Sequence, residues 1–207
     1  NLDWAKDGSG FYYSRFPATG EGETFQALNT NQQVYFHRLG TEQAQDGLIY
    51  ETPEQPELNH TAQVSDDGRW LIVTSSSGTD DRYEVTLIDL EDESATPRVL
   101  VPGFDNNYSY VGNSGDAFYF VTNDGAPLKK VVKTDVSAAD PQWTTVIPER
   151  AETLGGVSLV GGHLVASYLK DAKSMIEVFA LDGTPVRQVA LPGIGSAGGF
   201  GGSPDES

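Results

Sequence analysis

The chain has 207 residues, 38% of them hydrophobic, and its 30 acidic residues against 13 basic ones give a net charge of −17. A surface this acidic repels phosphate backbones and anionic lipids, which argues against nucleic acid and membrane surfaces as partners. The absence of cysteine excludes a disulfide framework, a thiolate metal site and a cysteine nucleophile.

Short segments rich in Val, Ile, Tyr, Phe and Thr follow one another along the whole chain, and Gly, Asp, Asn and Pro separate them. This pattern is typical of strands and turns. No window has an apolar period of 3.6 residues, so we expect almost no helix. In chain order, the predicted strands are 2–4 (partial), 10–15, 33–39 and 47–51; 61–65, 70–75, 84–89 and 98–100; 107–112, 117–122, 129–134 and 144–147; 153–160, 163–170, 174–180 and 186–190.

Three markers repeat in the same phase along these strands. Turn glycines at Gly8, Gly68, Gly115 and Gly162 are spaced by 60, 47 and 47 residues. Acidic residues closing a strand recur at Asp89, Asp135 and Asp182, and prolines ending a unit recur at Pro53, Pro102, Pro148 and Pro192. Segment 17–32 accounts for the longer first interval, and its Gly, Thr, Asn and acidic residues predict a mobile loop insertion.

Units of about 47 residues with four strands each predict the blades of an all-β propeller. A blade is a small twisted sheet that buries its two faces only against neighbours. We therefore predict one partial β-propeller domain with two uncovered faces, so that either the real polypeptide is longer than this chain or the fragment self-associates through these faces. The predicted blades are 1–55, 56–103, 104–149 and 150–192, with the start of a fifth at 193–207.

Several stretches resemble the propeller of the prolyl oligopeptidase (prolyl endopeptidase) family, and they keep that family's order over essentially the whole chain. The acidic, cysteine-free composition of the chain suggests a bacterial member of that family. The stretches are WAKDGSGFYYSR at 4–15, VYFHRLGT at 34–41, SDDGRW at 65–70, SGTD at 77–80 and LPGIGS at 191–196.

The resemblance implies a seven-bladed propeller seated on an α/β-hydrolase domain that cleaves after proline with a Ser-His-Asp triad. This chain would then hold four middle-to-late blades and the start of the next. The hydrolase domain of the same enzyme would be its partner, and short proline-containing peptides the substrates. Residues 75–81 would face the shared cavity, where some relatives carry an arginine and a cysteine. The matching positions are Ser76 and Thr79, so neither contact carries over, and Asn59 is a further candidate for substrate binding.

The chain carries no catalytic constellation of its own. The G-x-S-x-G spacing of a nucleophile elbow is absent. His37, His60 and His163 lie in separate units without metal-ligand spacing, and we expect strand-surface or loop histidines with local hydrogen bonds. Gly193-x-Gly195-x-x-Gly198 matches a dinucleotide fingerprint, but the glycines and proline that follow cannot form the required helix, so we expect a strand or bend. We predict no metal and no cofactor.

Three functional hypotheses remain at this point. The first is a non-catalytic gating part of a serine endopeptidase that cleaves after proline. The second is a free-standing propeller that binds partners without belonging to an enzyme. The third is a related serine peptidase with another residue preference. The parent gene separates the first two, because a downstream hydrolase domain would settle the question. The expected compartment is cytoplasm or periplasm, and no segment approaches the apolar length needed to cross a bilayer.

Overall fold

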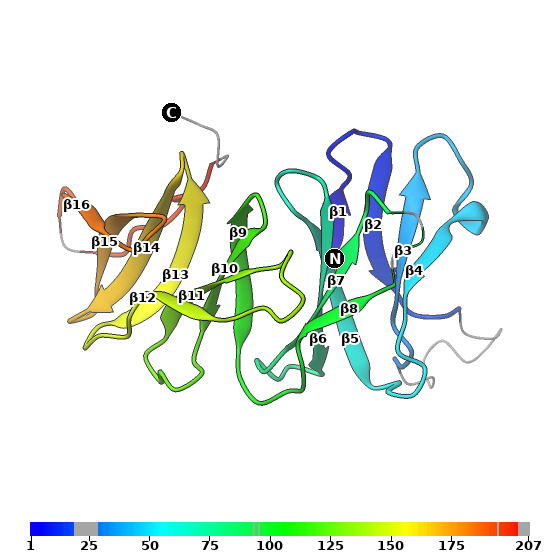
Figure 1. Ribbon diagram of the computed structural model, residues 1–207, viewed down its shortest axis with the longest axis horizontal. Helices are drawn as coiled ribbons and strands as arrows, with labels where there is room; N and C mark the ends of the chain where they lie inside the picture. The colour runs from blue at the N-terminus through cyan, green and yellow to red at the C-terminus, as the bar shows by residue number, and fades with distance from the viewer. Residues whose placement is uncertain (19–28, 93, 95, 194, 203–207) are drawn as a thin grey trace. The chain divides into compact units, whose positions relative to one another are not determined.

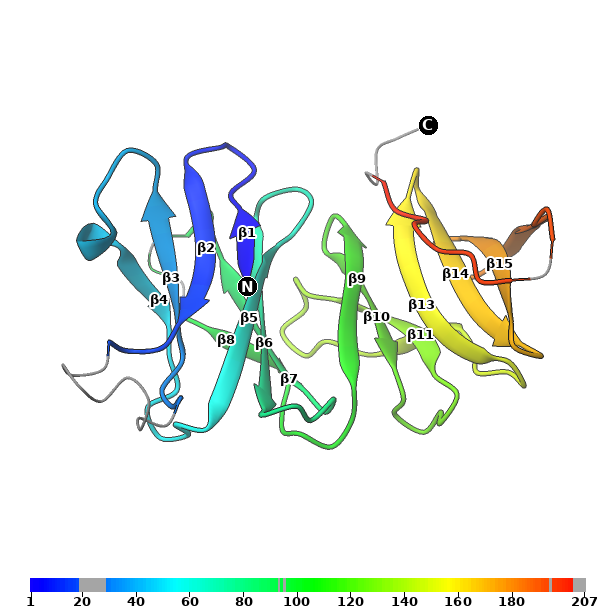
Figure 2. The same cartoon turned by 180° about the vertical axis from the view of Figure 1, so that it is seen from behind.

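The computed structural model describes residues 1–18, 29–92, 94, 96–193 and 195–202, which hold sixteen strands and one short 3₁₀ helix. The strands form four antiparallel sheets, each a simple meander of four consecutive strands (Figure 1, Figure 2). Two compact units, 1–105 and 106–207, contain two sheets each. The all-β prediction is confirmed, and the only helix in the described residues is η1 (Gln43–Gln45).

The first unit contains β1 (Leu2–Trp4), β2 (Gly10–Arg15), β3 (Gln33–Arg38) and β4 (Gly47–Tyr50), followed by β5 (Leu58–Val64), β6 (Trp70–Ser77), β7 (Glu84–Asp89) and β8 (Arg98–Val101). The second contains β9 (Tyr108–Ser114), β10 (Ala117–Thr122), β11 (Lys130–Asp135) and β12 (Thr144–Ile147), followed by β13 (Thr153–Val160), β14 (His163–Lys170), β15 (Lys173–Ala180) and β16 (Pro185–Val189). The predicted strands are all present, with ends shifted by a few residues; β5 begins three residues earlier than predicted. Most of the predicted insertion, residues 19–28, lies outside the described residues.

In the first unit, β5 contacts β1, β2 and β3 and so packs the second sheet onto the first. Its side chains alternate, with Leu58, His60, Ala62 and Val64 buried. Ala62 and Val64 join an apolar cluster with Tyr12 and Val34 of the first sheet. The alternation of apolar and polar residues along β5 therefore decides which face meets the first sheet.

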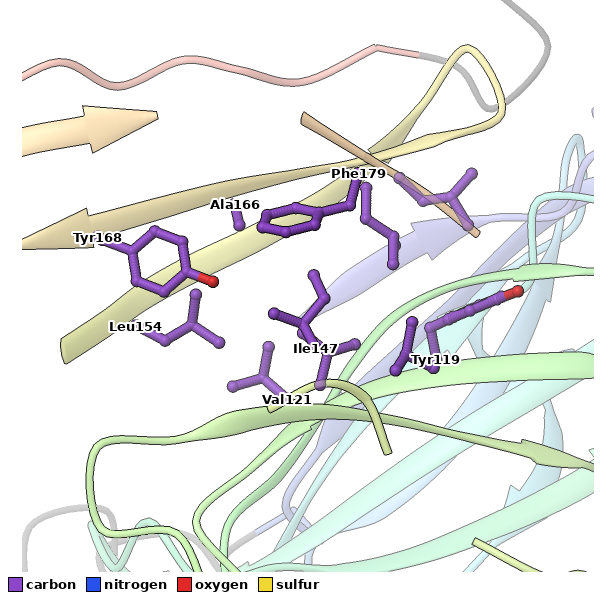
Figure 3. Packing of buried hydrophobic residues seen from close by; sticks show 11 residues of the cluster. Tyr119, Val121, Ile147, Leu154, Ala166, Tyr168 and Phe179 are labelled. Atoms are coloured by element: carbon purple, nitrogen blue, oxygen red, sulfur yellow. The ribbon is translucent and has the colours of Figure 1, made fainter. Parts of the chain in front are cut away.

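In the second unit, β13 packs against β9, and an apolar cluster joins the third and fourth sheets (Figure 3). Leu164 and Leu154 are almost fully buried there, and Tyr119 and Val121 come from the facing sheet. Burial of these apolar side chains is the main term that stabilises the packing of the fourth sheet on the third.

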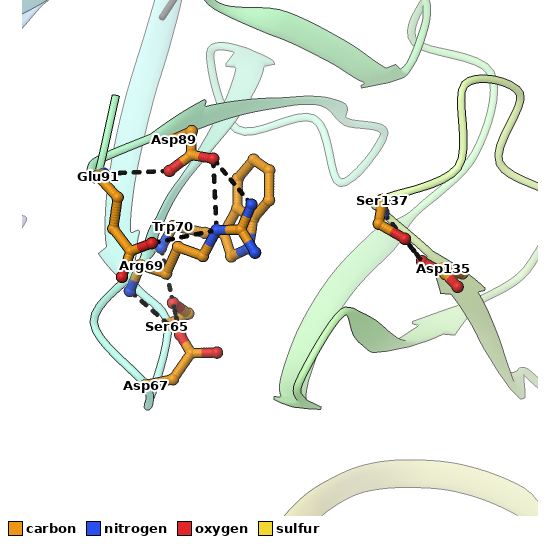
Figure 4. Close-up of polar contacts among 8 residues, drawn as sticks. All are labelled: Ser65, Asp67, Arg69, Trp70, Asp89, Glu91, Asp135 and Ser137. Carbon is orange, nitrogen blue, oxygen red and sulfur yellow. Dashed lines mark hydrogen bonds and ion pairs between the residues drawn. The ribbon is translucent and has the colours of Figure 1, made fainter. Parts of the chain in front are cut away.

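The recurring turn glycines have a conformational reason. Gly68 has a φ of 80°, a region that glycine reaches without a steric penalty. Asp67 precedes it and accepts hydrogen bonds from the Ser65 hydroxyl at 2.5 Å and the Arg69 amide at 3.1 Å (Figure 4). The Asp-Gly pair thus shapes the tight turn between the first and second strands, as predicted.

The recurring acidic residues shape the turn between the third and fourth strands. Asp135 accepts hydrogen bonds from the Ser137 hydroxyl at 2.6 Å and amide at 2.9 Å (Figure 4). Asp182 accepts from the Thr184 amide at 2.8 Å. The bonds from Ser137 hold the pKa of Asp135 below its ordinary value. The periodicity of the acidic residues is therefore local turn chemistry.

The glycine-rich segment after β16 forms bends, and its described residues contain no strand or helix. Ser174 holds it, because the Ser174 amide donates to the Gly195 carbonyl at 3.0 Å and the Ser174 hydroxyl accepts from the Ala197 amide at 2.9 Å. Of the two predicted alternatives, strand or bend, the structure has the bend. A dinucleotide-binding helix does not follow in residues 195–202.

One buried hydroxyl gives a test of the core. Tyr168 is 3% exposed, and its hydroxyl has no hydrogen-bond partner among the described residues. Burial raises the pKa of Tyr168. Tyr168→Phe should therefore leave the free energy of unfolding unchanged or increase it by up to about 1 kcal/mol, since an unpaired buried polar atom is removed. Chemical denaturation would check this, and a clear loss of stability would contradict it.

Candidate functional site

The three residues predicted to contact substrate lie at one end of the second sheet. Asn59 on β5 and Ser76 on β6 are register partners, and both are half-buried. Thr79 is exposed in the connection between β6 and β7. The structure thus brings Asn59 and Ser76 together and leaves Thr79 beyond the end of the strand.

The connection that carries Thr79 is shaped by an ion pair. Arg82 Nε donates to Asp80 Oδ1 at 2.9 Å, and the Arg82 amide donates to the same carboxylate at 3.0 Å. The bonds from Arg82 lower the pKa of Asp80 to about 2. Beside Thr79, the negative charge of Asp80 is therefore paired within the loop.

His60 is the feature of this end that sequence reasoning misjudged. The prediction of a strand-surface or loop histidine with local hydrogen bonds is wrong, because His60 is only 2% exposed and its ring bonds to Ser75 and Thr52, which lie 15 and 8 residues away in the sequence. Nδ1 lies 2.9 Å from the Ser75 hydroxyl, and Nε2 lies 3.1 Å from the Thr52 hydroxyl. The signal available in the sequence was the alternation of β5, which places position 60 on the same face as Leu58 and Ala62.

The Ser75–His60 pair has the spacing of a nucleophile and its base, but its surroundings do not suit that chemistry. The second ring nitrogen meets a threonine hydroxyl, where a catalytic histidine needs a carboxylate to stabilise its charged form. Burial lowers the pKa of His60 to about 4, so the ring is neutral at physiological pH. Both Ser75 and His60 are buried, so no substrate reaches the hydroxyl.

A second polar cluster lies on the outer face of the first sheet, which we define as the face of Leu2, Trp4, Phe11, Tyr13, Tyr35, His37 and Leu48. Asp46 accepts from the Tyr13 hydroxyl at 2.6 Å and lies 2.8 Å from His37 Nδ1. Burial opposes ionisation of Asp46, but these two hydrogen bonds outweigh it and keep its pKa below the ordinary value. Next to the cluster is an open cavity of about 330 Å³, which is lined by Leu2 and Phe11 together with these polar groups, Asn1 and Gln43.

The remaining features do not point to a further chemical centre. His163 Nδ1 lies 2.7 Å from the Gly161 carbonyl and the residue is exposed at the start of β14, as expected for a strand-surface histidine with a local hydrogen bond. Across the part of the chain that the structure describes, three or more His, Asp or Glu side chains nowhere gather as a candidate metal site. No helix in the described ranges has the length and apolarity to span a membrane.

Comparisons with known proteins place this arrangement in a family. The family model of the prolyl oligopeptidase N-terminal β-propeller domain matches residues 1–207. Prolyl endopeptidase from Elizabethkingia meningoseptica is 35% identical over 206 residues, which cover 99% of this chain and 29% of that enzyme. Prolyl oligopeptidase A from Amanita bisporigera is 27% identical over 206 residues, covering 95% of this chain and 27% of that protein.

Solved structures agree with the sequence relatives. A structure from work on inter-domain dynamics in two prolyl endopeptidases has a TM-score of 0.90 at 42% identity, covering 100% of this chain and 29% of that one. Prolyl oligopeptidase B from Galerina marginata, bound to a 25mer macrocyclization substrate, has a TM-score of 0.91 at 28% identity, covering 98% and 29%. The chain thus spans less than a third of the length of each of these relatives.

The predicted propeller fold and the predicted family resemblance are both confirmed by these matches. Three findings lead to the same conclusion: the four-stranded meanders, the family model that matches the whole sequence, and the relatives found by sequence and by structure. The chain belongs to the N-terminal β-propeller domain family of the prolyl oligopeptidases.

Proposed function

We propose that this chain is the non-catalytic propeller portion of a serine endopeptidase that cleaves after proline, and that it limits access to a hydrolase domain of the same polypeptide. The observation that carries the proposal is the match of the propeller model to residues 1–207 in a sequence without a nucleophile elbow. A rigid wall of sheets would admit short, unstructured peptides and exclude folded proteins, so that the chemistry occurs away from bulk water.

The proposal is tested on the full-length parent polypeptide and on this chain alone. The parent should cleave a short chromogenic peptide after proline, and its kcat/KM should fall steeply when the same sequence is placed in a folded protein. The chain alone should be inactive on both substrates. Equal cleavage of folded and short substrates would argue against gating, and a parent without hydrolase activity would favour a free-standing binding module.

Asn59, Ser76 and Thr79 are proposed as peptide contacts within this function. Thr79 offers the sharper test, because it is exposed and its change should not disturb the strands. In the parent enzyme, Thr79→Asp should change KM for an extended proline peptide by about tenfold, equal to about 1.4 kcal/mol of binding energy. Leu39→Asp, also at an exposed loop position, is the matched control. An unchanged KM would remove Thr79 from the site.

The outer face of the first sheet supports the proposal that the isolated chain self-associates. Leu2, Trp4 and Leu48 on this face are 50%, 49% and 46% exposed. Clustered apolar side chains of this kind mark association surfaces. At micromolar concentration the chain should sediment as a species larger than a monomer, and Trp4→Asp should shift it toward the monomer by at least tenfold in dissociation constant. A monodisperse wild-type monomer would refute this.

A further inference from the structure

We infer that His60 is a positioning residue for the proposed peptide-contacting edge, because it fixes the backbone beside Asn59 and Ser76 against the first sheet. The inference rests on the proposed function and deepens it. Asn59 and Ser76 would touch the peptide, whereas His60 acts only through them.

The His60 side chain joins three segments of the first unit. Its ring is bonded to Ser75 on β6 at 2.9 Å and to Thr52, which follows β4, at 3.1 Å. The ring of Tyr50 on β4 lies edge-on, with its centroid 5.1 Å from that of His60. Because both ring nitrogens are hydrogen-bonded, the buried ring is held in one orientation. The ring therefore makes directional hydrogen bonds in addition to its packing contact with Tyr50.

The backbone amide and carbonyl of His60 are also hydrogen-bonded to side chains. The His60 amide donates to Gln32 Oε1 at 2.5 Å, and the His60 carbonyl accepts from the Ser14 hydroxyl at 2.6 Å. That amide belongs to the peptide group joining Asn59 to His60. Gln32 therefore fixes the backbone immediately after Asn59, from a segment that leads into β3.

The register of the second sheet transmits this restraint to the edge. His60 pairs with Ser75, and the next pair along the strands is Asn59 with Ser76. Adjacent side chains on a strand point to opposite faces, so the first pair faces the first sheet and the second pair faces away from it. A displacement of the His60–Ser75 pair therefore moves Asn59 and Ser76 together.

The fourth sheet indicates that packing alone does not require a histidine here. The corresponding pair there is Leu154 with Tyr168, and both side chains lie in the apolar cluster of the second unit. A leucine and a tyrosine, without side-chain hydrogen bonds between them, thus form the corresponding pair in a sister sheet. In the second sheet, the His60–Ser75 pair adds directional hydrogen bonds. Such bonds would hold the neighbouring residues Asn59 and Ser76 in the geometry that peptide contact requires.

The test uses the full-length parent enzyme and two changes at one position. His60→Leu introduces the residue type that the fourth sheet carries and removes both ring hydrogen bonds, whereas His60→Gln keeps an amide that can bond both hydroxyls. His60→Leu should raise KM for an extended proline peptide about tenfold, with kcat within twofold of wild type, since misplacement of a positioning edge weakens binding. His60→Gln should restore KM to within about threefold of wild type.

His163→Leu is the matched control, because His163 is exposed and its ring bonds to the Gly161 carbonyl, only two residues away; the KM of this variant should not change. A wild-type KM for His60→Leu would overturn the inference, as would a fall in kcat with KM unchanged, which would indicate only a loss of folded enzyme. If the wild-type parent does not cleave proline peptides at all, the proposed function fails first, and this is visible before any variant is made.

Discussion

Gly183→Ala is expected to lower the free energy of unfolding of the second unit by about 2 to 5 kcal/mol, the sum of backbone strain and overpacking. Gly183 has a φ of 89° in the turn between β15 and β16. A Cβ at this position would meet the carbonyl oxygen of Val146 on β12. The turn therefore needs glycine both for its conformation and for the close approach of the fourth sheet to the third.

Gly162→Ala separates the two effects. Gly162 has a φ of 68° in the turn between β13 and β14, but a Cβ there would have no atom within 4 Å. This variant should lose only the strain, about 1 to 2 kcal/mol. Guanidinium denaturation of both variants, followed by tryptophan fluorescence and circular dichroism, gives the comparison. Equal losses at the two positions would mean that the third and fourth sheets do not approach closely at Val146.

Acidification should destabilise the chain through His60. The pKa of this ring is about 4 in the folded chain, against an ordinary value of 6.5. Between these two pH values the unfolded chain binds the proton and the folded chain does not, so stability falls as the pH is lowered. The loss begins near pH 6.5 and reaches about 3 kcal/mol by pH 4. The ring faces the hydroxyl groups of Ser75 and Thr52 and the aromatic ring of Tyr50, and among the described residues no carboxylate bonds to it to offset the charge.

His60→Gln isolates this contribution from the titration of the many carboxylates. Between pH 7.5 and 4.5 the variant should lose about 2.5 kcal/mol less stability than wild type, because glutamine does not titrate. Urea unfolding curves at the two pH values provide the numbers. If the free energy of unfolding depended on pH equally in wild type and His60→Gln, the His60 ring would be protonated in the folded chain without any loss of stability, which would contradict the prediction.

The sequence predicted the strands well because each is short and bounded by residues with strong turn preferences. Asp67 and Gly68 act within a few residues of each other, so their turn is visible in the sequence. The His60 network was not predictable in this way. Ser14, Gln32 and Thr52 reach His60 from distant points of the chain, and only the packing of β5 on the first sheet brings them together.

The same limit applies to the cluster around Asp46. Tyr13 and Asp46 are 33 residues apart and meet across the first sheet. Tyr13, Tyr35 and His37 follow the strand period, so their common face was implicit in the pattern. The partner carboxylate lies in the connection between β3 and β4, where no period constrains its position. The candidate contacts Asn59 and Ser76 were named from resemblance, and the register now pairs them.

The join between the first and second sheets has a consequence for how such molecules diversify. No strand of one sheet is in ladder register with a strand of the other; β5 is instead held by side chains, with Asn1 Nδ2 donating to the Ala62 carbonyl at 2.7 Å and Asp3 Oδ2 accepting from the Val64 amide at 2.6 Å. A whole meander can therefore be duplicated, lost or exchanged without breaking a hydrogen-bond ladder, provided that a few anchoring side chains travel with it. Recombination that exchanges complete sheets therefore leaves the hydrogen-bond ladders intact, whereas recombination within a sheet breaks them.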